Sequence, residues 1–268
     1  MRRSLLSTDE AESVERDRLN GGGCGTESRD YRSVVAIDGP AAAGKSTVAR
    51  QLAERLGALL FDTGTLYRAV TLAALRAGVS VDDGHALAAL ADDRHIEVRA
   101  PSEPDGRLYD VLLDGEDVTW PIRELTVDAN VSDVSAHPAV RSALLPAQRR
   151  IAELGPVVMV GRDIGTEVIP DAGVKIFLDA SLGERARRRA TEMKERGLAV
   201  SLAEVEADLE RRDAIDSGRA ASPLRAAVDA HVVSTDGLTV DQVVERIAAI
   251  VDQIQHASSK TPMRQAAV

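Results

Sequence analysis

The chain of 268 residues is long enough for one well-buried core of roughly 200 residues with appendages. Its net charge of −10 argues against a general nucleic-acid-binding protein, because affinity for a phosphate backbone requires a surplus of Lys and Arg. No apolar stretch approaches the roughly 20 residues that cross a bilayer, so no membrane segment is predicted. Cys24 is the only cysteine, which excludes an intramolecular disulfide and favours a reducing, cytoplasmic location.

The first 30 residues are predicted to form a disordered tail. Their apolar residues are scattered among Asp, Glu and Ser, without the apolar run of roughly 7–15 residues that a secretory signal requires. The Asn20–Gly23 stretch is typical of a flexible tether. At the other end, residues 257–268 lose helical periodicity and contain Pro262, which predicts a frayed terminus. Residues 31–256 are therefore expected to form the folded domain.

Between the tails, short β-branched runs alternate with longer helical patterns. This alternation is typical of an α/β fold in which helices cover both faces of a parallel sheet. Short apolar runs are what buried parallel strands require. The five predicted strands are Val34–Ile37, Leu59–Phe61, Val157–Val160, Val174–Leu178 and His231–Val233.

The segment Ile96–Asp117 interrupts this alternation. Two strand-like runs flank a region that contains proline and glycine, which predicts a small antiparallel insert outside the main sheet. The clearest helix ends the domain, because apolar residues from Val240 to Ile254 repeat at three- and four-residue intervals. This apolar stripe is expected to close the core.

The first predicted strand leads directly into a glycine-rich loop. The sequence from Gly39 to Thr47 matches G-x-x-x-x-G-K-S/T in its required strand–loop–helix context, which is typical of nucleoside triphosphate binding. A plain strand-to-helix turn is disfavoured because position, flanks and all four fixed residues agree. The predicted phosphate-binding residues are Gly39, Pro40, Ala41, Ala42, Ala43, Gly44, Lys45, Ser46 and Thr47.

The chemistry of such a loop gives each residue type a role. Glycine allows backbone N–H groups to curl around phosphate oxygens, and the following helix presents its positive end to them. Lys45 is expected to reach the β- and γ-phosphates of the nucleoside triphosphate, and is therefore a candidate catalytic residue. The hydroxyl of Ser46 is the predicted Mg²⁺ ligand.

Two further motifs follow strand ends, where open α/β folds place their ligands. After the second strand, Thr63 can supply a hydroxyl, Tyr67 a ring and Arg68 a forked pair with an acceptor phosphate. After the third strand, Arg162 offers a second phosphate donor, while Asp163 either accepts from ribose hydroxyls or associates with the metal ion. An isolated arginine is usually a solvated charge, but the position at a strand end favours a binding role.

A candidate helix near the C-terminus carries Arg212, Asp216 and Arg219 at i, i+4 and i+7, which places them on one face. Two arginines on one face suit a transition state whose charge spreads over phosphoryl oxygens. On spacing alone, a solvated face with a weak ion pair is an equally good interpretation. The preceding arginines are expected to be solvated, with one of them available to stack on adenine. They are Arg185, Arg187, Arg188 and Arg189.

The glycine-rich loop, the motifs after the second and third strands, the segment Ser132–Arg141 and the helix with Arg212 occur together in one chain. This combination resembles the bacterial cytidylate kinase family over about residues 34–254. The resemblance implies a P-loop nucleoside monophosphate kinase core, with the antiparallel insert in an acceptor-binding region of about residues 62–150 and a helical lid at about residues 183–225. It also implies transfer of the γ-phosphoryl group of ATP to CMP or dCMP by a monomer.

The resemblance also implies residue roles. Ser132 and Arg141 would bind the cytosine, and Asp163 and Asp216 would hold the sugar. The residues that would line the CMP site are Thr63, Arg68, Ser132, Arg141, Arg162, Asp163, Arg212, Asp216 and Arg219, and Tyr67 joins them through its motif. The candidate catalytic residues are Lys45, Arg162, Arg212 and Arg219. Thr63 stands where some members have Ser, which retains the hydroxyl.

Two alternative functions share the glycine-rich loop. A P-loop kinase for another small acceptor, such as shikimate or a different nucleotide, would need other residues after the second and third strands. A non-enzymatic ATP-binding regulator would use the tails for docking. Substrate-dependent release of ADP separates the regulator from both kinases.

Overall fold

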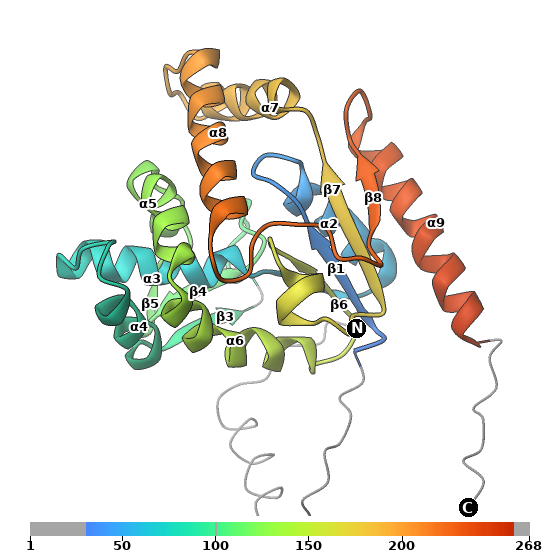
Figure 1. Ribbon diagram of the computed structural model, residues 1–268, viewed down its shortest axis with the longest axis horizontal. Helices are drawn as coiled ribbons and strands as arrows, with labels where there is room; N and C mark the ends of the chain where they lie inside the picture. Colours follow the sequence, from blue (N-terminus) through green and yellow to red (C-terminus); the bar gives the residue numbers. More distant parts are fainter. Residues whose placement is uncertain (1–30, 100, 260–268) are drawn as a thin grey trace, which may run out of the picture.

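A five-stranded parallel sheet in the order β2-β6-β1-β7-β8 forms the centre of the protein (Figure 1). The computed structural model describes residues 31–99 and 101–259, so the predicted tail of residues 1–30 and residues 260–268 lie outside the described residues. The strands are β1 (Val34–Asp38), β2 (Leu59–Asp62), β6 (Val157–Val160), β7 (Val174–Asp179) and β8 (His231–Ser234). All five predicted strands are confirmed, and each predicted end lies within one residue of the observed one.

The strand order decides where a site can form. Strand β1 pairs with β6 and β7 in parallel, and β6 pairs with β2 in parallel. The carboxyl ends of β1, β2 and β6 therefore meet at one edge of the sheet. The three motifs that follow these strands in the sequence are brought together there.

Alternate residues of the strands face two different layers of helices, as the pleat of a strand requires. Val35 and Ile37 pack with the layer on one face, whereas Val34 and Ala36 pack with the layer on the other. The first layer contains α2 (Lys45–Leu56) and α9 (Val240–Ser259). The second contains α3 (Gly64–Ala77), α4 (Gly84–Asp93), α5 (Leu125–Ala136) and α6 (Pro138–Ala152). The prediction that helices cover both faces is confirmed.

Helix α9 closes the first layer with the predicted apolar stripe. Val243, Ile247 and Val251 are buried against the sheet and against α2. The helix continues to Ser259, so its end lies beyond the boundary predicted near residue 256. Among the described residues, none of the helices combines the length and the apolar character that a bilayer crossing needs.

The segment predicted as an insert forms a separate three-stranded antiparallel sheet, which confirms that prediction. Its strands are β3 (Ile96–Arg99), β4 (Asp110–Leu113) and β5 (Glu116–Asp117). Val111 of β4 is buried in a cluster with Leu72 of α3. The insert therefore supports the outer side of the helix that also carries Arg68.

Two further helices, α7 (Leu182–Glu195) and α8 (Leu202–Gly218), pack against each other above the glycine-rich loop (Figure 1). Ser201 and Glu204 form a reciprocal capping box that defines the start of α8. Ala41 of the loop, Ala186 of α7 and Leu209 of α8 share one apolar cluster. This cluster links the helical pair to the loop.

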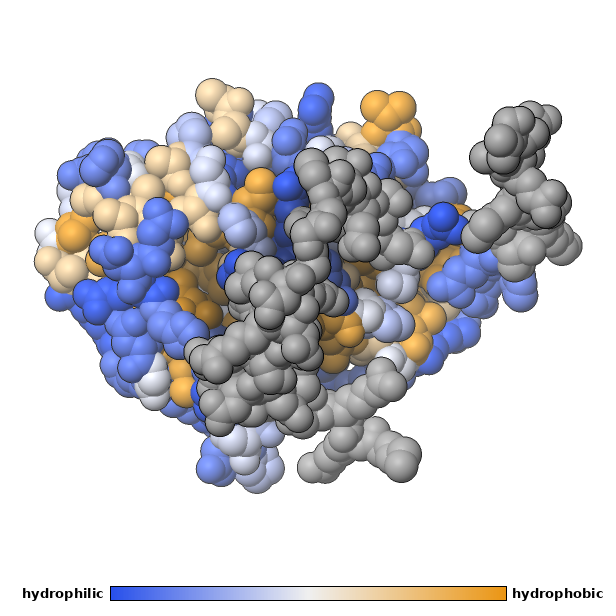
Figure 2. Space-filling view, turned by 90° about the horizontal axis from the view of Figure 1, so that it is seen from below, coloured by the Kyte–Doolittle hydropathy of each residue, from blue (hydrophilic) through white to orange (hydrophobic). Residues whose placement is uncertain are grey.

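The exterior is mixed in character. Figure 2 shows hydrophilic residues over much of the face seen from below, with smaller apolar areas between them. Two short turns complete the described chain. They are a 3₁₀ turn, η1 (Pro121–Arg123), and a π-helical turn, η2 (Ile164–Val168).

Gly39 at the start of the loop provides a test of this packing. Its φ angle is +148°, and a Cβ atom there would lie 2.0 Å from the main-chain oxygen of Leu178 in β7. Because backbone atoms cannot move aside at low cost, Gly39→Ala should lower the free energy of unfolding by roughly 3 kcal/mol or more, measured by urea denaturation. Gly57→Ala is the matched control, since Gly57 has φ +61° but no neighbour within 4 Å. It should cost about 1 kcal/mol, and equal losses would contradict this account.

Candidate active site

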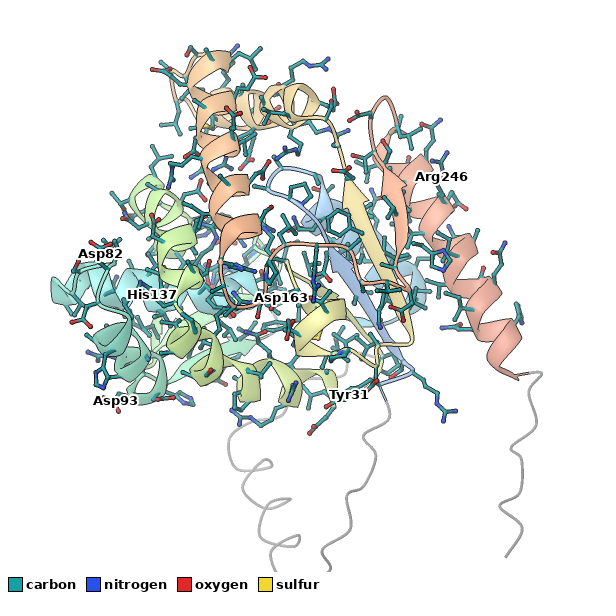
Figure 3. All side chains as sticks on the ribbon, viewed as in Figure 1. Tyr31, Asp82, Asp93, His137, Asp163 and Arg246 are labelled. Carbon is teal, nitrogen blue, oxygen red and sulfur yellow. The ribbon has the colours of Figure 1, made fainter. Side chains whose placement is uncertain are left out.

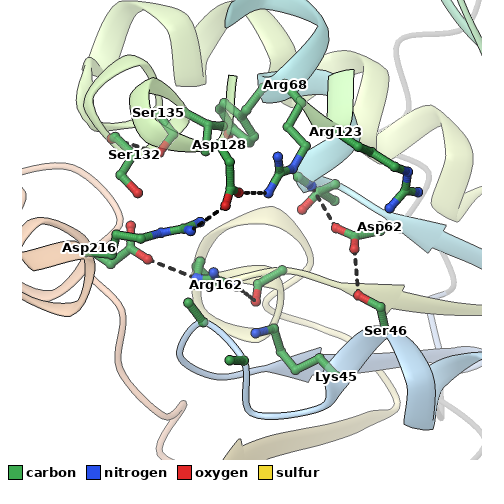
Figure 4. A pocket seen from close by; sticks show the side chains of 18 of the residues that line it. Lys45, Ser46, Asp62, Arg68, Arg123, Asp128, Ser132, Ser135, Arg162 and Asp216 are labelled. Carbon is green, nitrogen blue, oxygen red and sulfur yellow. Dashed lines mark hydrogen bonds and ion pairs between the residues drawn. The ribbon is translucent and has the colours of Figure 1, made fainter. Parts of the chain in front are cut away.

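A cleft of about 720 Å³ opens at the carboxyl ends of β1, β2 and β6 (Figure 4). Its walls combine the glycine-rich loop, the two motifs that follow β2 and β6, helix α5 and the helical pair α7 and α8. The predicted site residues in its walls are Ala41, Ala42, Gly44, Lys45, Ser46, Thr47, Thr63, Tyr67, Arg68, Ser132, Arg141, Arg162, Asp163, Arg212, Asp216 and Arg219. Gly39, Pro40 and Ala43 belong to the loop but are not among the lining residues.

The glycine-rich loop curls back on itself. Ala42 and Gly44 have φ angles of +60° and +91°, which turn the chain sharply before α2 begins. The Lys45 ammonium is buried and donates a hydrogen bond of 2.6 Å to the main-chain oxygen of Pro40. Burial, and then the nearby charge of Arg162, lower the pKa of Lys45 well below its ordinary value. An anionic ligand at this point would therefore stabilise the charged form of Lys45.

A hydroxyl and a carboxylate meet beside the loop. Ser46 Oγ donates to Asp62 Oδ2 over 2.9 Å, and Asp62 Oδ1 accepts from the main-chain N–H of Gly64 over 3.0 Å. Oxygen ligands of this kind suit Mg²⁺, which binds few protein groups and keeps water and phosphate oxygens as its other ligands. The described residues contain no cluster of three or more His, Cys, Asp or Glu side chains that could hold a metal. Asp62 was not predicted as a site residue, although it directly follows the predicted strand Leu59–Phe61 and ends the observed strand β2.

The far end of the cleft is built around Arg141. Its guanidinium contacts the Asp163 carboxylate, donates to the main-chain oxygen of Ser135 over 3.1 Å, and lies 5.2 Å from the centre of the Tyr67 ring. Its Nε is buried without a hydrogen-bond partner. Ser132 is buried in the same wall. Free polar groups next to an aromatic ring can bind the edge and the face of a base.

Asp163 lies near the centre of the molecule (Figure 3). Its carboxylate contacts Arg141 and lies 3.9 Å from Arg219 Nη2. The hydroxyl of Thr63 donates to the main-chain oxygen of Val160 over 3.0 Å, so Thr63 has only acceptor capacity left for a ligand.

Two arginines converge on Asp216 of α8. Arg162 Nε donates to Asp216 Oδ2 over 2.9 Å, and Arg219 Nη1 donates to Asp216 Oδ1 over 3.4 Å. Arg212, Asp216 and Arg219 are only 7%, 4% and 8% exposed. The alternative interpretation of these residues as a solvated face is therefore wrong. Burial also leaves Nε of Arg212 and Nη2 of Arg219 without hydrogen-bond partners.

The prediction that Arg185, Arg187, Arg188 and Arg189 are solvated is wrong for two of them. Arg185 is 5% exposed, and its guanidinium donates to the main-chain oxygen of Ala41 over 3.2 Å and to Asp213 over 2.6 Å. Arg189 reaches into the cleft and contacts Asp128 on α5. Their partners lie far away in the sequence, so local spacing could not identify these roles.

Asp38, the last residue of β1, supports the turn that follows Asp163. Its two carboxylate oxygens accept from the main-chain N–H groups of Ile164 and Gly165, each over 2.8 Å. Burial raises the pKa of Asp38 from 3.8 to about 6, although the two backbone hydrogen bonds partly offset this effect. The strand that leads into the glycine-rich loop therefore also holds the Arg162–Asp163 turn.

The pKa of Asp38 gives a test by pH. Because the folded value of about 6 exceeds the unfolded value near 3.8, the stability gained by protonation is complete below the unfolded value and is lost as pH rises through 6. Asp38→Asn cannot titrate, and should unfold more easily by roughly 1–3 kcal/mol at pH 8 because an amide satisfies only one of the two N–H groups. The stability of the wild type relative to the variant should rise by about 1 kcal/mol from pH 8 to pH 5, measured by urea denaturation. A pH-independent difference would refute the raised pKa.

Comparison with known proteins gives an independent result. A family model described as cytidylate kinase matches residues 35–253. The cytidylate kinase of Herpetosiphon aurantiacus is 51% identical over 217 residues, which cover 81% of this chain and 93% of that protein. The cytidylate kinase of Geobacillus kaustophilus is 51% identical over 222 residues, which cover 83% and 97% of the two chains. The chain therefore belongs to the cytidylate kinase family.

Proposed function

We propose that this protein transfers the γ-phosphoryl group of ATP to CMP or dCMP, giving ADP and CDP or dCDP. The observation that carries the proposal is one cleft in which a phosphate-binding loop faces buried arginines and aspartates from the acceptor side. Family membership supports the same reaction. The groups of Arg141 and Ser132 beside an aromatic ring suit a nucleotide base better than a sugar-like acceptor, which has no base.

On the donor side, ATP lies with its phosphates on the loop and its γ-phosphate toward the cleft. Backbone N–H groups of the loop and the start of α2 bind the phosphate oxygens. Lys45 exchanges its hydrogen bond with Pro40 for phosphate oxygens. Ser46 and Asp62 would hold Mg²⁺, which neutralises part of the phosphate charge when it is bound.

On the acceptor side, the nucleotide lies between α5 and α8. Ser132 and Arg141 bind the cytosine edge, and the Tyr67 ring lies beside them. Asp163 and Asp216 accept from sugar hydroxyls, with Thr63 as a further acceptor group. The phosphate of CMP lies among the arginines of the cleft. Those assigned to it are Arg68, Arg162, Arg212 and Arg219.

The transfer itself needs no general base, because an oxygen of the CMP phosphate is already anionic. This oxygen attacks the γ-phosphorus as the bond to the β-γ bridging oxygen breaks, and ADP leaves. Arg162, Arg212 and Arg219 stabilise charge that spreads over the transferring oxygens. Helices α7 and α8 form the lid that excludes water and so suppresses hydrolysis of ATP.

We further propose that the protein acts as a cytoplasmic monomer on small nucleotides. The net charge of −10 disfavours binding to nucleic acid. ATP and nucleoside monophosphates are cytoplasmic metabolites, which supports this location.

A coupled assay of ADP release with each nucleoside monophosphate tests the function. CMP or dCMP should give the highest kcat/KM, because Arg141 and Ser132 offer hydrogen-bonding groups suited to the cytosine edge. Shikimate is the control acceptor and should give only background ADP release. The proposal fails if AMP, GMP or UMP is used faster than both CMP and dCMP, or if no acceptor stimulates ADP release.

Two substitutions test the phosphate-binding roles. Lys45→Ala and Arg68→Ala should each lower kcat/KM at least roughly a hundredfold, because each removes a charged contact to the transferring or the accepting phosphate. Arg76→Ala is the matched control for Arg68. Arg76 lies on the same helix but is exposed and pairs with Glu116, so its loss should change kcat/KM less than about twofold. Wild-type kinetics for Lys45→Ala or Arg68→Ala would exclude the assigned role.

A further inference from the structure

One carboxylate of the cleft is surrounded by arginines from three different helices. Asp128 of α5 contacts Arg68 of α3 over 2.6 Å, Arg212 of α8 over 3.4 Å, and Arg189 of α7. Its side chain is 12% exposed and forms part of the cleft wall. Figure 4 shows this carboxylate between Arg68 and the neighbouring guanidinium groups.

Asp128 has no role in the reaction as described above. Asp163 and Asp216 are assigned to the sugar, and Asp62 is assigned to the metal ion together with Ser46. Burial alone would raise the pKa of Asp128, but the charges of Arg212, Arg68 and Arg189 outweigh burial and hold the pKa below its ordinary value. The cleft therefore contains a permanent anion among the cations that are assigned to phosphate.

The arginines around Asp128 still have capacity for a second anion. Three guanidinium groups contact this one carboxylate, and two of them also approach an exposed acid: Arg189 pairs with Glu192 over 2.8 Å, and Arg212 lies 4.0 Å from Asp208. Nε of Arg212 is buried without a hydrogen-bond partner. Carboxylate and phosphate oxygens make the same kind of charge-assisted hydrogen bond to a guanidinium group. An arriving phosphate would therefore use the same cations that Asp128 now neutralises.

We propose that Asp128 is a positioning residue that acts as a built-in counter-anion: it holds Arg68, Arg189 and Arg212 together before CMP binds, and then competes with the CMP phosphate for them. This inference rests on the proposed function of the cleft. Two negative charges that share the same cations oppose each other. The charge of Asp128 therefore stabilises the nucleotide-free enzyme and weakens the binding of the acceptor phosphate.

The same contact connects the two sides of the cleft. Arg68 lies on the acceptor side, whereas Arg189 and Arg212 lie on the two helices proposed as the lid. Without the Asp128 charge, the repulsion between these cations would act to separate the helices until a phosphate arrives. Asp128 thus lowers the free energy needed to bring the arginines together when CMP binds. It also weakens the binding of the CMP phosphate to these arginines.

Calorimetric binding of CMP and of cytidine to Asp128→Asn distinguishes the effect of the lost charge from a change in the shape of the site. The variant should bind CMP about five- to tenfold more tightly than the wild type, because one competing charge is lost. Its affinity for cytidine, which has no phosphate, should stay within about twofold. Asp133→Asn is the matched control on the same helix, since Asp133 is exposed and lies 3.6 Å from Arg211. It should change neither affinity.

Thermal unfolding provides a second measurement. Nucleotide-free Asp128→Asn should melt about 2–5 °C below the wild type, and the increase in melting temperature on adding CMP or inorganic phosphate should be larger than in the wild type. Asp128→Glu keeps the charge and should behave like the wild type in both measurements. This variant shows whether an effect of the asparagine comes from the lost charge or from a disturbed helix.

The inference is overturned if Asp128→Asn binds CMP more weakly or no more tightly than the wild type. It is also overturned if the affinities for CMP and cytidine change by the same factor, because that pattern indicates a purely structural role. A wild-type protein that binds no CMP would instead refute the proposed function. The two failures are therefore distinguishable.

Discussion

The whole site depends on one electrostatic constraint, which is the need to keep many cations close together in a partly buried cleft. Arg141, Arg162, Arg212 and Arg219 are all substantially buried, and each lies within ion-pair distance of an aspartate. Buried charges of one sign would separate the helices that carry them unless carboxylates compensate for them. Aspartates on α5, α8 and the loop after β6 provide this compensation, while Nε of Arg141, Nε of Arg212 and Nη2 of Arg219 remain without hydrogen-bond partners.

Strand pairing and two packing contacts place these charged groups around the cleft. Parallel pairing of β1, β2 and β6 brings the three loops that follow these strands to one edge of the sheet, where their residues line one cleft. The small antiparallel sheet supports α3 from outside, and the α7–α8 pair covers the loop through an apolar cluster at Ala41. Rigid elements thus surround a cleft whose lining combines charged side chains with apolar ones such as Val131 and Leu209.

The main features of the fold were predictable from sequence because they depend on local patterns. Buried parallel strands are short apolar runs, and the glycine-rich loop has a fixed spacing that only its chemistry explains. The partners of the charged residues were not predictable in the same way. Arg68 and Asp128 are separated by 60 positions, and Arg185 and the oxygen it binds at Ala41 by 144. Single-sequence spacing holds no information on such pairs, so Asp38, Asp62, Asp128 and Arg185 were missed.

The position of Asp38 has a geometric consequence for the reaction. Its main chain continues directly into the glycine-rich loop, while its side chain fixes the turn that carries Arg162 and Asp163. A single residue therefore sets the distance between this loop and this turn. Any inserted residue between Asp38 and Lys45, or between Val160 and Gly165, would therefore shift the glycine-rich loop relative to the turn that carries Arg162 and Asp163.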